Sequence, residues 1–167
     1  MMSEVLKIDE IDKQIINLIQ DQPSLTHTQI AKKVNRSQPT VGMRIRKLEE
    51  IGVLQFQAGI NLKTADMYFA RVEIQTKSPE KIYKIAKTCP FMLNAFRTSG
   101  DYNVSLLITS FTLKDIEKIV NFHFRSMAEV KKIIINVITD VLTDYIVPIN
   151  FEFHCDCKNC LILEEKD

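Results

Sequence analysis

The spacing of apolar residues changes once along this chain, and that change limits the folds open to it. In the first 55 residues, apolar side chains such as Ile11, Ile15 and Ile19 recur at the spacing of one buried helix face. From about residue 67 the pattern alternates, as in 68–76, which is typical of a half-buried strand. The 167 residues can form two small units, so we expect a helical unit followed by one built on a sheet.

The helical unit is predicted to contain a helix-turn-helix. Asp9 can cap a first helix that Pro23 stops, and a second helix is expected from about Thr26 or Thr28 to Val34. Two short helices with a tight turn between them, the second with a basic exposed face, are typical of this DNA-binding motif.

The third helix should begin just after Ser37. A serine is a good N-cap, and Pro39 fits the first turn because its missing amide would be unpaired there anyway. Gly52 can end the helix, and a strand is expected over 53–60. The segments are then a helix-turn-helix domain at 1–55, a strand and linker at 56–66, a sheet domain at 67–150 and a tail at 151–167.

The distribution of charge points to nucleic acid more than the net charge does. The formal net charge is +1, but the window 22–48 has no Asp or Glu and six Lys and Arg residues. Such a basic patch suits a phosphate backbone, although a solvated helix face would look the same. No apolar stretch approaches the roughly 18 to 20 residues that span a bilayer, and 1–9 carries charges instead of a secretory signal. We expect a cytoplasmic protein with no membrane partner.

The sheet domain predicts the order strand, helix, strand, strand, helix, strand. This is the ferredoxin-like βαββαβ arrangement, so the whole chain is α+β. One sheet face carries both helices, and the open face needs a partner or a ligand, which argues for a homodimer. The expected strands are 68–76, 91–98, 104–110 and 130–139, and the expected helices are 78–88 and 112–127.

Three segments together resemble the Lrp/AsnC family of prokaryotic feast/famine transcription regulators. They are 8–12, then 37–41 running into 44–53, and Ser99-Gly100-Asp101-Tyr102-Asn103 in the sheet domain. The resemblance covers about residues 6 to 150. It implies a DNA-binding first domain and a second domain that dimerises and assembles dimers into larger oligomers. It also implies a small effector, often an amino acid, held in clefts between second domains.

The resemblance and the motif place the third helix in the major groove of double-stranded DNA, on a pseudo-palindromic operator. Gln can pair with adenine, Arg with guanine, and a Thr methyl can touch thymine. Phosphate contacts set the register without reading sequence. The expected base-facing residues are Gln38, Thr40, Met43 and Arg44, and the expected phosphate contacts are Lys32, Arg36, Ser37, Arg46 and Lys47.

Two positions of the third helix depart from the family pattern. Gly42 stands where the family often has Ser, and Met43 where it often has a basic residue. A glycine within a helix costs about 1 kcal/mol relative to Ala, which suggests a close backbone approach, such as one to DNA. The base preferences of relatives therefore do not carry over.

The turn 99–103 matches the family's effector loop, and Asn136, Val137, Ile138 and Thr139 match a segment that faces the effector in relatives. Asp101 and the loop amides could bind an amino acid's ammonium and carboxylate groups. Asn103 replaces a second acid that the family usually carries, which removes one charge partner. A tight hairpin in which Gly100 and Asn103 only serve backbone geometry is the alternative.

The tail contains His154, Cys155, Cys157 and Cys160. Three thiols and one imidazole could form a tetrahedral zinc site, and cuprous ion is a second candidate. A disulfide, a redox sensor and inert thiols are the other possibilities. If this cluster acts, the protein is a metal- or redox-responsive regulator, whereas Cys89 is expected to be a buried thiol.

Two further functions stay open at this point. A sirohaem-decarboxylase-like enzyme would share the fold, but its Arg-rich segment is absent from 55–60, and no catalytic pair is evident. His123 lies on an otherwise apolar helix and is expected in a core or an interface. An architectural DNA-wrapping protein would share every residue named so far, and broad, weak footprints would distinguish it.

Overall fold

The computed structural model describes residues 8–149. The chain divides into two compact units, 1–57 and 58–167, and each is described by itself. Among the described residues, no helix is long and apolar enough to cross a membrane.

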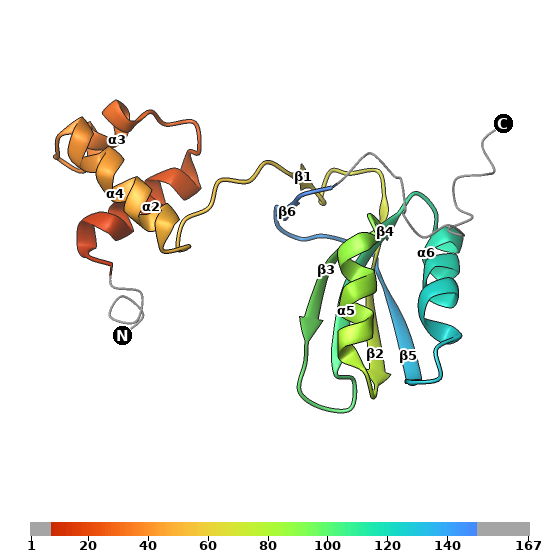
Figure 1. Cartoon of the computed structure of the whole chain (residues 1–167). Coiled ribbons are helices and arrows are strands. Elements are labelled where there is room, and N and C mark those ends of the chain that lie inside the picture. Colours follow the sequence, from red (N-terminus) through yellow and green to blue (C-terminus); the bar gives the residue numbers. More distant parts are fainter. Residues whose placement is uncertain (1–7, 150–167) are drawn as a thin grey trace. The chain divides into compact units, whose positions relative to one another are not determined.

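In the first unit, three helices pack on one apolar core (Figure 1). They are α2 (Glu10–Asp21), α3 (His27–Lys33) and α4 (Gln38–Glu50). Each begins at a side-chain cap: Asp9 and Thr26 form capping boxes with the third residue of their helices, and Ser37 accepts a hydrogen bond from the Thr40 N–H. The predicted N-caps at Asp9 and Ser37 are confirmed.

The end of α4 is fixed by Gly52. Its φ is +71°, a left-handed conformation that suits glycine, and its N–H donates to the Glu49 carbonyl while the Val53 N–H donates to Leu48. The strand predicted at 53–60 is wrong, because β1 covers only Ile60–Asn61. Residues 53–59 have no hydrogen-bonded neighbouring strand in the described chain, and alternation alone does not make a strand.

The second unit confirms the predicted βαββαβ order. Its elements are β2 (Tyr68–Thr76), α5 (Pro79–Thr88), β3 (Met92–Arg97), β4 (Val104–Ser110), α6 (Leu113–Val120), and β5 (Val130–Ile138). The strands form an antiparallel sheet in the order β3-β4-β2-β5. Two details differ from expectation. The helix after Thr112 changes at Val120 to a π-helical turn, η1 (Asn121–Arg125), and Ser78 makes no side-chain cap bond.

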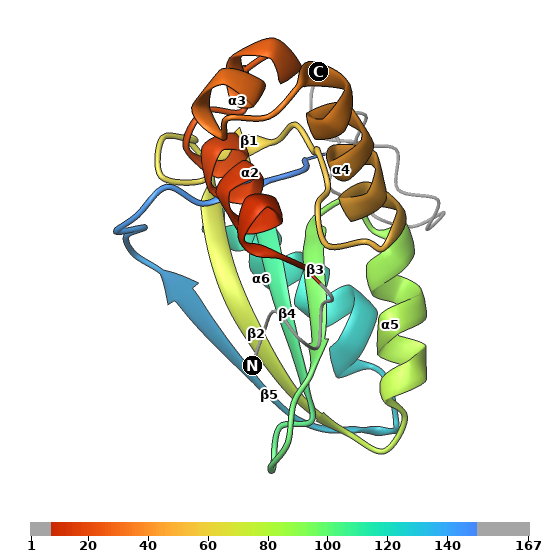
Figure 2. The same ribbon diagram turned by 90° about the vertical axis from the view of Figure 1, so that its left-hand side faces the viewer.

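The two faces of this sheet have different surroundings. Ala70, Val72 and Ile74 of β2 point toward α5 and α6, which cover one face (Figure 2), and they join buried residues such as Ile82 and Phe124 in the main core. The intervening β2 residues, including Arg71 and Glu73, therefore face the other side. The predicted open face exists, and it carries charge.

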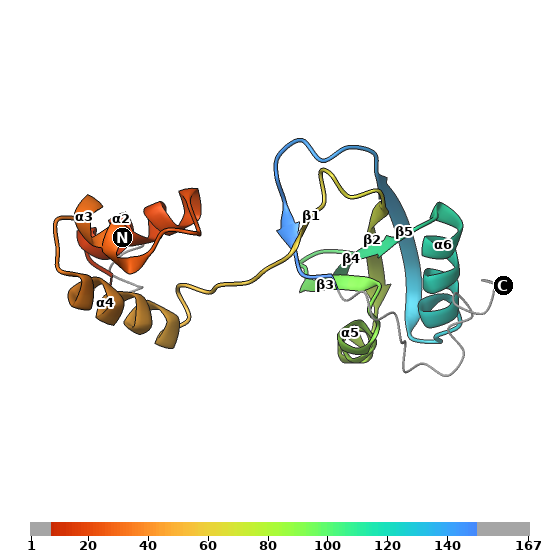
Figure 3. The same cartoon turned by 90° about the horizontal axis from the view of Figure 1, so that it is seen from above.

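One end of the open face is covered by a short ribbon. β1 pairs with β6 (Ile146–Val147), and seen from above this ribbon lies on the opposite side of β2 from α6 (Figure 3). Leu62 and Val147 pack there on Phe69 and Leu107. Gly59 permits the close approach, since a Cβ would lie 2.5 Å from the Val147 carbonyl oxygen.

Candidate nucleic-acid interface and ligand cavities

The outward face of α4 is the candidate DNA-reading surface. Val41, Ile45 and Leu48 point inward and are at most 4% exposed, which leaves the opposite face free for a partner. Met43 is 67% exposed, an unusual position for a large apolar side chain. Arg46 is also exposed on this face.

Polar residues near the start of α4 divide into free and engaged side chains. Gln38 is exposed, whereas the hydroxyl oxygens of Ser37 and Thr40 lie 2.7 Å apart in a hydrogen bond. Ser37 also caps the helix through the Thr40 N–H. Thr40 can therefore offer its methyl group more readily than its hydroxyl.

The remaining cations of the first unit lie at the surface. Lys32, Lys33, Arg36 and Lys47 are all exposed, and Arg36 Nη1 donates to the carbonyl oxygen of Asn35. Their exposure is compatible with phosphate contacts, which need flexible, reachable cations.

Arg44 lies elsewhere than the sequence suggested. Its Nη1 is 2.7 Å from Asp9 Oδ2 and 2.7 Å from Asp12 Oδ1, so it joins α4 to the start of α2. The Asp12 side chain is only 4% exposed. The Asp12 backbone N–H and the Arg44 guanidinium hold the pKa of Asp9 below its usual range. The observed contacts assign Arg44 to the packing of the helices and differ from the base contact expected above.

Gly42 also has a role within the unit. A Cβ at this position would lie 3.3 Å from Nδ1 of His27, the first residue of α3. The small residue thus lets α3 and α4 approach each other. This contact replaces the close approach to DNA suggested from the sequence.

In the second unit, the turn 99–103 joins β3 to β4. Gly100 has a φ of +111°, which favours glycine, and Thr98 donates to the Tyr102 carbonyl. The Asn103 amide accepts from the Thr76 N–H at 3.0 Å and donates to the Thr76 carbonyl at 2.8 Å. Asn103 is thereby committed to holding β2 against β4, as the alternative hairpin interpretation expects.

A cavity of about 480 Å³ lies beside this turn. Acidic and basic groups both line it, and three of the predicted effector residues take part. Its lining residues are Arg71, Glu73, Arg97, Thr98, Ser99, Asp101 and Tyr102.

The segment 136–139 is divided between the two faces of the sheet. Asn136 and Ile138 pair with Arg71 and Phe69 and share their open face, whereas Val137 pairs with Ala70 on the helix side. Asn136 Nδ2 donates to Glu73 Oε2 at 3.3 Å. Asn136 therefore supports the cavity through Glu73.

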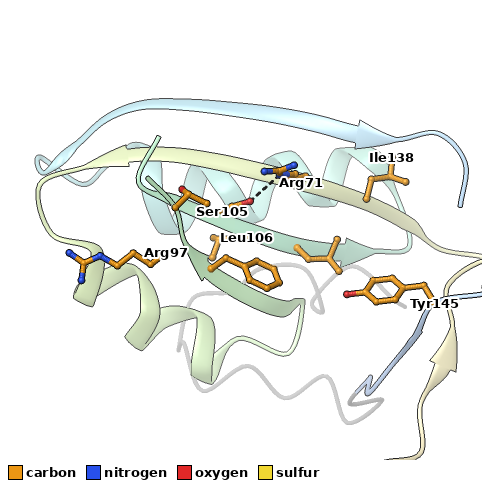
Figure 4. A pocket seen from close by; sticks show the side chains of 9 residues that line it. Arg71, Arg97, Ser105, Leu106, Ile138 and Tyr145 are labelled. Carbon is orange, nitrogen blue, oxygen red and sulfur yellow. Dashed lines mark hydrogen bonds between the residues drawn. The ribbon is translucent and has the colours of Figure 1, made fainter. Parts of the chain in front are cut away.

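A second cavity, of about 500 Å³, adjoins the first because Arg71, Arg97 and Thr98 line both. Figure 4 shows Arg97 and Tyr145 on opposite sides of it, with Arg71 bonded to Ser105 between them. The sequence reasoning missed Arg71, Glu73 and Arg97. Charges at alternate positions of the otherwise apolar stretch 68–76 were the available signal.

The other predicted residues fall as follows. Cys89 is buried as expected, at 3% exposed, and His123 is buried at 8%, where burial lowers its pKa. The metal cluster at His154 and the three tail cysteines lies outside the described residues. Within 8–149, no group of three or more His, Cys, Asp or Glu could hold a metal ion.

Comparison with known proteins bears on the whole chain. A family model described as winged helix-turn-helix DNA-binding matches residues 8–55. The HTH-type transcriptional regulator LrpA of Pyrococcus horikoshii is 27% identical over 139 residues, which is 81% of this chain and 99% of the relative. LrpA of Pyrococcus abyssi is 26% identical over 118 residues, covering 68% of this chain and 84% of that protein.

Solved structures show the same two-part fold. Escherichia coli AsnC matches 81% of this chain and 95% of its own at 15% identity, with a TM-score of 0.69. A Neisseria meningitidis transcriptional regulator in complex with L-Met matches 81% and 92% at 17% identity, with a TM-score of 0.73. The chain belongs to the Lrp/AsnC family.

Membership of the Lrp/AsnC family settles the coarse function. The protein is a DNA-binding transcription regulator, and its helix-turn-helix is the part that binds DNA. The relatives are transcription regulators, so the enzyme alternative receives no support.

Proposed function

We propose that this Lrp/AsnC regulator binds a pseudo-palindromic operator as a homodimer and that an amino acid controls it from the cavity beside the turn 99–103. The observation that carries the effector proposal is the mixed charge of that cavity. Arg71 and Arg97 can bind a carboxylate, and Glu73 and Asp101 can bind an ammonium group.

For DNA, α4 lies in the major groove in this proposal. Gln38 and Met43 are exposed on α4 and can reach base edges, Met43 through apolar contact with a thymine methyl group. Arg46, Lys47, Lys32 and Arg36 contact phosphates. Since Arg44 is held by Asp9 and Asp12, it positions α4 and does not read a base.

For assembly, the open sheet face supports a homodimer. Phe96, Tyr145 and Ile146 are 47%, 45% and 53% exposed, a large apolar area for a free surface. A second copy would cover such side chains, and a twofold dimer presents two α4 helices to two half-sites.

For the effector, the zwitterion of an amino acid matches both charges of the cavity. Asp101 is exposed and Glu73 is held by Asn136, so one acid can adapt to the ligand while the other stays fixed. The Neisseria meningitidis protein of the same fold was solved with L-Met, which supports this ligand class.

Isothermal titration of the full chain with each of the twenty amino acids tests the effector proposal. We expect one or a few to bind, and Asp101→Asn to weaken that binding about tenfold or more through loss of a charged hydrogen bond. Asp140→Asn is the matched control, because Asp140 is exposed and does not line the cavity. No heat from any amino acid, or equal binding by both variants, contradicts the proposal.

A further inference from the structure

The second cavity on the open sheet face has a polar end and an apolar end. Arg97 and Thr98 lie toward one end, where β3 finishes, and Ile138 and Tyr145 lie toward the other (Figure 4). Leu107 adds an apolar wall at 9% exposed. The cavity holds about 500 Å³, enough for a small organic molecule.

Both charged residues that line it among the described residues are arginines, Arg71 and Arg97. Arg71 Nε donates to Ser105 Oγ at 3.1 Å, and its Nη2 lies 3.3 Å from Glu73 Oε1, so its guanidinium is held in place. Arg97 has no printed ion pair or hydrogen bond through its side chain within 8–149. A guanidinium carries five donors, so both arginines retain donors for a ligand.

The carboxylates nearby belong to the adjoining cavity. Glu73 and Asp101 line the space beside the turn and do not line this one. A ligand's ammonium group would therefore face two guanidinium groups without an acidic partner, an unfavourable arrangement. A carboxylate at the same place would find charged donors, and the planar guanidinium matches its shape.

The apolar end needs a covering group. Tyr145 and Phe96 are about half exposed, and Ile138 lies beside them on the sheet face. A branched or aromatic hydrocarbon group would bury these surfaces while its carboxylate reached the arginines. The size and the two-ended chemistry of the cavity suit one molecule that has both parts.

We propose that this cavity binds a small monocarboxylate with a branched or aromatic apolar chain and no ammonium group. It is a second ligand site, separate in its chemistry from the amino-acid site beside the turn. Arg97 is the free carboxylate-binding group, Arg71 is the fixed one, and Tyr145 contacts the apolar chain.

Matched pairs of probes distinguish the two sites in the full chain. 4-Methylpentanoate and 3-phenylpropanoate lack the ammonium group of leucine and phenylalanine, and 4-methylpentanamide lacks the charge. We expect titration calorimetry to show binding of at least one carboxylate, with its amino acid and the amide at least tenfold weaker at this site.

Substitutions then locate the binding. Arg97→Met should weaken carboxylate binding at least tenfold, Arg97→Lys should retain part of it, and Tyr145→Ser should weaken it several-fold. Arg125→Met is the matched control, because Arg125 is exposed on η1 and does not line the cavity. Asp101→Asn should leave carboxylate binding unchanged while it weakens an amino acid at the turn.

Three results overturn the proposal. One is the absence of binding by every carboxylate probe, as would occur if a second copy filled the cavity. Another is a loss of carboxylate binding in Asp101→Asn with normal binding in Arg97→Met, which places the ligand beside the turn. The third is equal binding of acid and amide, which removes the role of the arginines.

Discussion

The two units of this Lrp/AsnC regulator use charged residues in opposite ways. In the first unit, exposed cations surround a small core, and the buried charges Asp12 and Arg44 pair with each other. In the second unit, Arg71 and Glu73 pair on a sheet face that is also lined by apolar groups. The first unit buries its apolar surface within itself, whereas the second leaves a face that needs a ligand or a partner.

The comparison predicts that Arg44 and Arg46, two arginines of one helix, differ sharply. Arg44→Ala should lower the free energy of unfolding of the first unit by about 3 kcal/mol, because it leaves Asp12 buried without its cation. Arg46→Ala should change it by less than about 0.5 kcal/mol. Urea unfolding of the full chain, followed by helix signal, measures both. Equal stability of the two variants would mean that Arg44 is an ordinary surface residue.

In the second unit, Asn103 tests whether the turn serves the fold. Asn103→Ala removes two hydrogen bonds to the Thr76 backbone and should cost about 1–2 kcal/mol of unfolding free energy. Ser99→Ala, in the same turn, is the control and should have little effect. If Asn103→Ala is as stable as the unaltered chain but loses effector binding, Asn103 is a ligand contact instead.

Salt dependence of DNA binding shows which cations contact phosphates. Arg46→Ala or Lys47→Ala should each reduce the slope of log K against log salt by about 1 and weaken binding to all sequences alike. An operator selected from genomic fragments serves as the probe. Lys131→Ala, an exposed cation of the second unit, should leave the slope unchanged. A slope that changes in that control but not in the α4 variants argues against α4 as the binding face.

The smallest expected effect is on acid stability. The pKa of Asp9 is lower in the folded chain than its usual 3.8, so its ionised form stabilises the fold above about pH 4. That contribution is lost as the pH falls through the lowered pKa. Asp9→Asn should therefore be less stable at neutral pH and should approach the unaltered chain below about pH 3. A constant difference across that range would exclude titration of Asp9 as the cause.

Much of the fold could be predicted because it depends on local signals. The caps at Asp9 and Ser37 and the strands over 68–76 and 104–110 follow from capping chemistry and alternation, and the structure has them there. The strand expected at 53–60 failed because a strand requires a hydrogen-bonded neighbour, and the neighbour β6 reaches only Ile60–Asn61.

The candidate site was harder to predict for the same reason. The turn 99–103 was located from its motif, but the partners of Asn103 and Arg44 are 27 and up to 35 residues away in sequence. Arg71 and Arg97 come together through the pairing of β2 and β3 with β4. Spacing along the chain holds no information about such neighbours.

The helix-turn-helix, its basic surface and the βαββαβ order were determined by the sequence itself, since each rests on periodicity, caps and charge within short segments. Tertiary packing decided which charges remain available. It turned Arg44 inward to Asp9 and Asp12, filled the space at Gly42 with His27, and placed Arg71 and Arg97 on a common cavity. Ion pairs and cavities depend on distances between elements, and those distances exist only once the core has formed.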